Sequence, residues 1–437
     1  MKWRRTLIAG AFFFFFLSCA GAPGAYREID LGIQNGSYTG ALASMETKDA
    51  KKNIYTGKNF ILLCLDRGMI RHYAELWEDS SRDLEEGERQ IEAAFTKSLS
   101  QEIASYIVND NTRDYAGEDY EDLYINVFNA LNYYHLNDLE GALVEIRRVN
   151  EKLRYLSDKY EAAIDKVVAS NKNLSTTNYT VTASKFSNSA LARYLGVLFY
   201  RGNGNMDDAR IDLEELREAY ALAPDVYRNS LPSSLDGELL VPRDKARLNV
   251  LSFTGLSPVK EGADRMIPLP LPSPNNWARL SLPQMLERPS AIHSVEVVLD
   301  SGERFGLELL EDMSAVARET FKAKYDLIVL KSIARTIIKA GTVAGIGAAL
   351  DSGNDSGWGV LFSFLGRIAA DVSEQADLRI SRYFPGYAYA GGVNVDPGVY
   401  SATVNYYGLR GLISSDRREN VLVEAGKLNL MEFVCLK

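Results

Sequence analysis

The chain has 437 residues, of which 24% are charged and 46% hydrophobic, and its formal net charge at pH 7 is −9. This length is enough for two or three domains with hydrophobic cores. The acidic balance argues against a nucleic-acid partner, because contacts with phosphates depend on clusters of Lys and Arg.

A secretory signal peptide is predicted at the N-terminus. Three basic residues flank the start of the apolar run TLIAGAFFFFFL (6–17), which is shorter than the about 20 residues that a permanent membrane span needs. The tetrad FLSC (16–19) resembles the lipobox of bacterial lipoproteins, with Phe where Leu is usual. This resemblance implies that residues 1–18 are removed and that Cys19 is lipidated. The alternatives are an ordinary signal peptide with an incidental cysteine and an uncleaved anchor.

Several acyl chains would hold the mature protein durably at a membrane, since each buried methylene contributes roughly 0.8 kcal/mol. Ala20 after the cysteine favours the outer membrane. After cleavage, 46 basic and 58 acidic residues remain, and the net charge becomes −12. Residues 19–34 are expected to form a tether between the anchor and the folded part.

Residues 35–228 have largely helical periodicity and contain four related stretches, each with a polar turn and a small residue at the seventh position. They are NGSYTGAL (35–42), AELWEDSS (74–81), LNDLEGAL (136–143) and NGNMDDAR (203–210), with Ala41, Ser80, Ala142 and Ala209 as the small residues. These stretches resemble the junction between the two helices of a tetratricopeptide repeat. Their spacing of 39, 62 and 67 residues departs from a repeat of about 34. We therefore expect degenerate repeats, with extra helices at 92–108 and 150–170.

Stacked helical repeats leave an extended concave surface to which another protein can bind. The stretch 75–92 carries eight acidic residues against Arg82 and Arg89, and it is either a solvated helix face or an acidic docking surface. Six tyrosines either line a peptide groove or pack between helices: Tyr120, Tyr124, Tyr133, Tyr134, Tyr194 and Tyr200. The helical half is therefore the expected site of protein binding.

A proline-rich joint is predicted at 229–290, where nine of the thirteen prolines lie. Its motif PLPLPSP (268–274) favours a polyproline II conformation and suits a stiff spacer or, alternatively, a ligand for another module. The alternating run 247–255 indicates a strand, and 293–312 is typical of a hairpin that turns at Asp-Ser-Gly.

Residues 291–437 are predicted to form a mixed α+β domain. A helix is expected at about 314–323, and strands are expected at 398–408, 419–426 and 427–436, where apolar and β-branched residues recur.

An apolar helical hairpin is predicted at 327–370 within this domain. In its first half, Lys331, Arg335 and Lys339 fall four residues apart, which places three cations on one helical face. The uncharged remainder, 340–350, is too short to span a bilayer. A buried hairpin is the favoured interpretation, and the alternatives are membrane contact through the cationic stripe and an inserted, pore-lining segment.

No catalytic or metal-binding motif stands out in the sequence. The three histidines, His72, His135 and His293, have no metal-ligand spacing, and phosphate-cradling loops and nucleophile elbows are missing. We therefore expect no cofactor, no metal and no enzymatic activity. For Cys64 and Cys435, two separate buried thiols are favoured over a disulfide.

Five strings occur in an order that resembles an uncharacterised family of bacterial lipoproteins with a tetratricopeptide-like N-terminal half and a mixed C-terminal half. The strings are LDRGMIRHYAELWEDSSRDLE (65–85), ALVEIRRVNEKL (142–153), TGLSPVKEG (254–262), SIARTIIK (332–339) and EQADLRISRYFP (374–385). The likeness runs from about 50 to 410. Where the family usually has a tryptophan, Ile380 and Ser381 stand here. In its genomic company the family is similar to small lipoproteins that activate peptidoglycan synthases, which implies an accessory role in cell-envelope assembly.

The resemblance also implies candidate binding residues, for which a purely structural role is the alternative. They are Asp66, Arg67, Gly68, Arg147, Pro258, Lys260, Arg335, Lys339, Asp377 and Arg379.

The predicted fold class is therefore α+β, with a tetratricopeptide-like helical array followed by a small mixed domain that carries a helical hairpin insert. The predicted function is that of a lipid-anchored cell-envelope scaffold that binds an envelope protein through its helical groove. The alternative is a membrane-contacting component of a secretion or transport machine. Both functions place the protein in the bacterial envelope, facing the periplasm.

Overall fold

The computed structural model describes most of the chain, with side chains except at 25, 98–100, 268 and 337–350. The described residues are 24–100, 113–156, 159–160, 164–165, 184, 186–268, 277–350 and 376–437. The predictions for the signal peptide, for Cys19 and for the second half of the apolar hairpin lie outside these residues, as does the side chain of Lys339.

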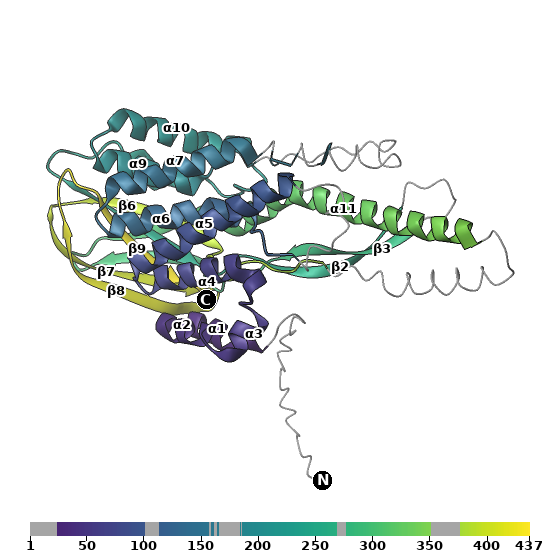
Figure 1. Cartoon of the computed structure of the whole chain (residues 1–437). Coiled ribbons are helices and arrows are strands. Elements are labelled where there is room, and N and C mark those ends of the chain that lie inside the picture. Colours follow the sequence, from purple (N-terminus) through teal and green to yellow (C-terminus); the bar gives the residue numbers. More distant parts are fainter. Residues whose placement is uncertain are drawn as a thin grey trace, which may run out of the picture.

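Four helical hairpins form most of the N-terminal half (Figure 1). They are α1 (Ala25–Gln34) with α2 (Tyr38–Met45), α4 (Phe60–Tyr73) with α5 (Trp77–Ser100), α6 (Asp119–His135) with α7 (Leu139–Leu156), and α9 (Ala190–Gly202) with α10 (Met206–Leu222). The short helix α3 (Lys48–Asn53) and two 3-10 turns, η1 (Gly57–Asn59) and η4 (Ser233–Gly237), complete the helical part described. The four predicted junctions are thus confirmed as turns between paired helices.

The four turns share one backbone conformation. Their second residues, Gly36, Glu75, Asn137 and Gly204, have φ values of 70°, 61°, 61° and 80°. In each turn the following N–H donates to the carbonyl five residues earlier, for example Ser37 N to Gly32 O at 2.8 Å, as in a Schellman motif. The small seventh residues are fully buried because the paired helices approach closely there, and Ser80 Oγ donates to the Gly68 carbonyl at 2.8 Å.

The additional helices predicted at 92–108 and 150–170 do not form separate elements where the chain is described. α5 is one helix of 24 residues that already contains the start of the first of them. α7 likewise continues past residue 150 and ends at Leu156. No glycine or proline interrupts the chain at residues 92 and 150, where separate helices were expected to begin, and this agrees with the continuous helices observed.

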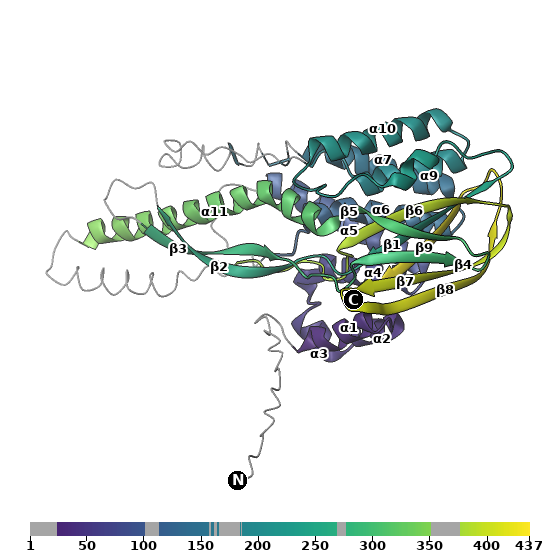
Figure 2. The same ribbon diagram turned by 180° about the vertical axis from the view of Figure 1, so that it is seen from behind.

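A nearly closed seven-stranded sheet forms most of the second half (Figures 1 and 2). Its strand order is β8-β7-β4-β5-β6-β1-β9, and every neighbouring pair is antiparallel except β1 with β9. The strands are β1 (Ala246–Thr254), β4 (Ser294–Leu299), β5 (Arg304–Asp312), β6 (Tyr387–Val395), β7 (Gly398–Gly408), β8 (Gly411–Val423) and β9 (Asn429–Cys435). The predicted strands at 247–255, 293–312, 398–408 and 427–436 are confirmed, whereas β8 begins eight residues before the predicted 419–426.

One hydrophobic core joins the helices to the sheet. Phe128 of α6 lies 5.0 Å from Phe253 of β1 and 6.0 Å from Phe384, measured between ring centroids. A second apolar cluster lines the inside of the curved sheet and includes Val250, Val404 and Phe433. The α+β class is therefore confirmed, while tetratricopeptide-like packing of the hairpins stays a prediction.

A long projection, which we call the arm, extends from the body (Figures 1 and 2). It consists of the two-stranded sheet β2 (Val259–Pro268) with β3 (Trp277–Leu286), together with the 38-residue helix α11 (Met313–Leu350). The helix expected at 314–323 and the first half of the apolar hairpin are thus one continuous helix. Leu280 and Leu282 of β3 pack in one apolar cluster with Leu327, Leu330 and Ile333 of α11.

The described part of the predicted cationic stripe on α11 is largely covered, in line with the favoured interpretation of a buried segment. Lys331 is half-buried and Arg335 is only 3% exposed, so these two side chains do not form an exposed cationic face. Among the described helices, none is both long and apolar enough to cross a membrane. Cys64 and Cys435 are buried free thiols, as expected.

The left-handed turn residue should matter to stability independently of packing. Gly204 (φ 80°) and Gly57 both have open space where a Cβ would stand, but only Gly204 has a positive φ. Gly204→Ala should lower the free energy of unfolding by about 1 kcal/mol, whereas Gly57→Ala should leave it nearly unchanged. Urea unfolding of both variants measures this, and equal stabilities would contradict the strain at the turn.

Candidate functional site

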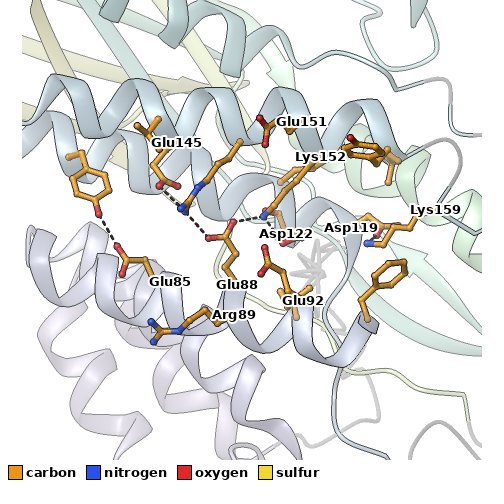
Figure 3. A pocket seen from close by; sticks show the side chains of 18 of the residues that line it. Glu85, Glu88, Arg89, Glu92, Asp119, Asp122, Glu145, Glu151, Lys152 and Lys159 are labelled. Atoms are coloured by element: carbon orange, nitrogen blue, oxygen red, sulfur yellow. Dashed lines mark hydrogen bonds and ion pairs between the residues drawn. The ribbon is translucent and has the colours of Figure 1, made fainter. Parts of the chain in front are cut away.

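A groove runs between α5, α6 and α7, with a volume of about 980 Å³ (Figure 3). Charged side chains dominate its lining, with eight carboxylates and four cations. The carboxylates are Glu85, Glu88, Glu92, Asp119, Asp122, Asp138, Glu145 and Glu151, and the cations are Arg89, Arg148, Lys152 and Lys159. The groove is therefore a concave surface with a net excess of four negative charges.

Helical periodicity brings these side chains together. On α7, Val144, Arg148, Glu151 and Tyr155 follow at intervals of three or four residues and so share one face. Glu85, Glu88 and Glu92 repeat the same spacing on α5, which faces α7 across the groove. Glu85, Glu88 and Glu92 of the acidic stretch 75–92 thus form one wall of the groove.

An ion-pair network forms the floor of the groove. Lys152 Nζ donates to Glu88 Oε1 at 2.6 Å and to Asp122 Oδ1 at 2.7 Å, which ties three helices together. Asn126 Nδ2 donates to Glu88 at 2.8 Å and to Glu145 at 2.7 Å. Arg148 Nη1 lies 3.1 Å from Glu145 and 3.3 Å from Glu88. These contacts connect the floor residues of all three helices to one another.

The two floor glutamates differ in their acidity. Burial opposes ionisation of Glu88, but the attraction of Lys152 and Arg148 and the hydrogen bonds from Lys152 and Asn126 together outweigh it, so the pKa of Glu88 lies below its ordinary value. Burial raises the pKa of Glu145, only partly offset by the hydrogen bond from Asn126. Glu88 is therefore the stable negative charge of the floor.

The rim of the groove offers both charge and apolar surface. Glu92 and Glu151 are exposed on opposite walls. Tyr155 is 72% exposed and Val144 is 42% exposed, although both belong to the lining. Exposed aromatic side chains such as tyrosine are common anchor residues in protein–protein interfaces.

Several predicted residues meet at residues 376–386, which precede β6 and which we call the return segment. Asp66 accepts hydrogen bonds from Ser381 Oγ at 2.7 Å and from the Arg382 N–H at 2.9 Å. Arg379 pairs with Asp377 at 2.7 Å, and Lys260 Nζ donates to the Arg379 carbonyl at 3.2 Å. Asp66, Lys260, Asp377 and Arg379 thus hold the return segment against the helices.

Two buried carboxylates bind the return segment, Asp66 from α4 and Glu121 from α6. Burial raises the pKa of Asp66 to about 6. Burial, together with the nearby Glu118, raises the pKa of Glu121 to about 7. Ser381 donates its hydroxyl to Asp66 and its N–H to Glu121 at 2.6 Å. A small polar residue at 381 therefore has a structural role here.

The remaining predicted residues lie apart. Arg67 pairs with Asp83 at 2.7 Å between α4 and α5, and Gly68 lies where a Cβ would come within 2.7 Å of Leu84. Arg147 is exposed on α7 but outside the groove lining, and Arg335 is buried in the arm. Pro258 follows β1 at the base of the arm. The predicted set is therefore not a single site.

A smaller hollow of about 190 Å³ continues from the groove toward the base of the arm. It shares Ile91, Phe95, Asp119 and Lys159 with the groove and adds Lys260 and Asp377 to its lining. Lys260 and Asp377, two of the predicted binding residues, thus lie beside the end of the groove nearest the arm. The sequence predicted only the α5 side of the groove.

A buried polar cluster that the sequence did not predict joins α4, α6 and β9. His72 Nε2 lies 2.7 Å from Glu432 Oε1, and His135 Nε2 lies 2.8 Å from Glu432 Oε2. His72 Nδ1 lies 2.7 Å from Asn132 Oδ1, and Trp77 stacks on His135 with ring centroids 4.1 Å apart. A lone acid in the apolar strand β9, Glu432, could have indicated a buried polar partner. The sequence could not identify that partner, because His72 and His135 lie about 300 or more residues earlier.

Comparison of the chain with protein-family models, with curated proteins and with solved structures found no match. Among the described residues, no three His, Cys, Asp or Glu side chains are placed to hold a metal ion. The groove geometry is therefore the main observation from which a function can be argued.

Glu432 should contribute stability that depends on pH. Burial disfavours its charge, but His72 and His135 more than compensate, so the pKa of Glu432 lies far below its ordinary value. A depressed carboxyl pKa stabilises the fold above the unfolded value of 4.5 and loses that effect as the pH falls below it. Glu432→Gln should therefore lower the free energy of unfolding at pH 7 by about 3 kcal/mol.

Chemical unfolding at pH 7 and pH 3 tests this, with a smaller difference between variant and parent expected at pH 3. Glu419→Gln, which removes an exposed pair with Arg417, is the control and should change stability by less than about 0.5 kcal/mol. A difference for Glu432→Gln that does not shrink in acid would contradict the role of the charge.

Proposed function

We propose that this protein is a lipid-anchored scaffold of the bacterial cell envelope that binds a cationic segment of a protein partner in the groove between α5, α6 and α7. The observation that carries this proposal is the groove itself, a concave surface of about 980 Å³ with twice as many carboxylates as cations. An accessory role in envelope or peptidoglycan assembly is part of the proposal.

The rim of the groove suits a protein segment that carries Lys or Arg. The exposed carboxylates Glu92 and Glu151 face a partner from both walls, and charge complementarity of this kind speeds association and rejects acidic competitors. Tyr155 and Val144 supply apolar contact area beside these charges. A peptide with spaced basic and apolar residues would satisfy both kinds of contact.

The floor of the groove favours binding over chemistry. Glu88 and Glu145 are held by Arg148, Lys152 and Asn126, so their lone pairs are already engaged. A floor fixed in advance reduces the conformational entropy that a partner must remove on binding. The proposal is therefore a binding role, not a catalytic one.

Reversing charge at the rim should weaken partner binding. The double variant Glu92→Lys, Glu151→Lys changes the groove by four charge units at two exposed positions, so it should reduce partner recovery about tenfold or more. Glu214→Lys with Glu218→Lys makes the same charge change on the exposed face of α10 and should leave recovery unchanged.

The measurement is photocrosslinking from position 155 in intact envelopes, followed by mapping of the crosslinked peptide. The proposal expects a Lys- or Arg-rich segment of one stoichiometric partner, whose crosslink is lost in the groove variant and kept in the α10 variant. A crosslink to an acidic or uncharged segment, or one that both variants retain, would refute it.

The lipid anchor is tested separately. Cys19→Ala removes the proposed acylation site, so the protein should move from the membrane fraction to the soluble periplasmic fraction. Metabolic labelling with a fatty-acid analogue should mark the parent chain and not the variant. Continued membrane association of an unlabelled Cys19→Ala chain would show that an uncleaved signal segment, not acylation, anchors the protein.

A further inference from the structure

The arm differs in charge from the rest of the protein. Its three elements, β2, β3 and α11, contain nine basic and four acidic residues, a net charge of +5. The whole chain carries −9, so the remainder has a net charge of −14. A basic projection on an acidic body is drawn toward anionic surfaces, while the body is repelled by them.

The hairpin of the arm has an inner and an outer face. Residues directly opposite in an antiparallel pair point to the same side, and successive residues alternate. Ile267 pairs with Ala278, which is buried against α11 together with Leu280 and Leu282. The directly opposite residues Met266 and Arg279, and Trp277, therefore belong to the outer face.

Large apolar side chains are exposed on this outer face. Trp277 is 56% exposed and Met266 is 60% exposed, and both lie at the end of the hairpin away from the body (Figure 2). Arg279, opposite Met266, has a side chain 73% exposed and pairs only with the exposed Asp264 among the contacts described for it. Apolar, aromatic and cationic groups thus share one accessible surface.

We propose that the outer face of the arm binds an anionic lipid surface. Tryptophan is favoured at the boundary between headgroups and acyl chains, methionine adds apolar contact, and arginine attracts lipid phosphates. At about 1.5 Å per residue, the 38 residues of α11 span about 57 Å. The arm can therefore reach a membrane while the groove stays free for its partner.

This contact differs from the one that the sequence suggested. The predicted cationic stripe on α11 includes Arg335, which is buried, whereas the proposed surface is on the hairpin. It also goes beyond the scaffold function, because it uses neither the groove nor the acyl chains. Failure of either proposal leaves the other in place.

The test is sedimentation of residues 20–437, which lack Cys19 but keep every described residue, with lipid vesicles. Binding is expected to vesicles containing phosphatidylglycerol, to weaken with added salt, and to be at least tenfold weaker to pure phosphatidylcholine. Trp277→Ala with Met266→Ala should weaken binding to the anionic vesicles about tenfold or more, whereas Trp277→Phe should retain most of it.

The matched control is Leu409→Ala with Leu412→Ala, which removes two exposed apolar side chains, 88% and 59% exposed, from the turn after β7 and the start of β8. It should bind as the parent does, and thermal unfolding should show that all variants fold. The proposal is overturned if the parent does not bind anionic vesicles, if the hairpin variant binds equally well, or if the protein sediments without vesicles through self-association.

Discussion

Buried carboxylates that find their donors on another layer join the two halves of this protein. Glu311, in β5, is fully buried and accepts hydrogen bonds from Tyr124 of α6 at 2.7 Å, from Tyr227 at 2.6 Å and from Ser189 at the start of α9 at 3.0 Å. Glu432 does the same from β9 with two histidines. A buried carboxylate without such donors is strongly unfavourable, so the helices and the sheet have one relative position in which these groups are satisfied.

That constraint also determines where the groove and the arm lie. α6, one of the three helices that form the groove, is fixed to the sheet by Tyr124, which donates to Glu311, and by His135, which lies 2.8 Å from Glu432. Asp66 and Glu121 hold the return segment of the arm from the helical side, and Lys260 and Arg379 secure its base. The acidic groove and the base of the basic arm are thus linked by shared lining residues and direct packing (Figure 1).

Much of the local structure could be predicted. The four helix junctions have a polar residue or glycine that adopts a positive φ and a small residue where the helices meet, and both requirements are local. The hairpin of β4 and β5 and the strands β1, β7 and β9 likewise follow from alternation and turn residues. The continuity of α11 was not predicted: a helix at about 314–323 and a separate apolar segment from 327 were expected, whereas residues 313–350 form one helix that packs against β3.

The sequence by itself determined the helical and strand periods, the turns between them and the acidic face of α5. These features depend on residues close together in the chain, where spacing alone decides which side chains share a face. The tertiary structure alone decided the second wall of the groove on α7, the burial of Arg335 and the pairing of Glu432 with His72 and His135. These depend on contacts between residues as much as 360 positions apart, and such contacts arise from burial of polar groups on different layers, which no local pattern encodes.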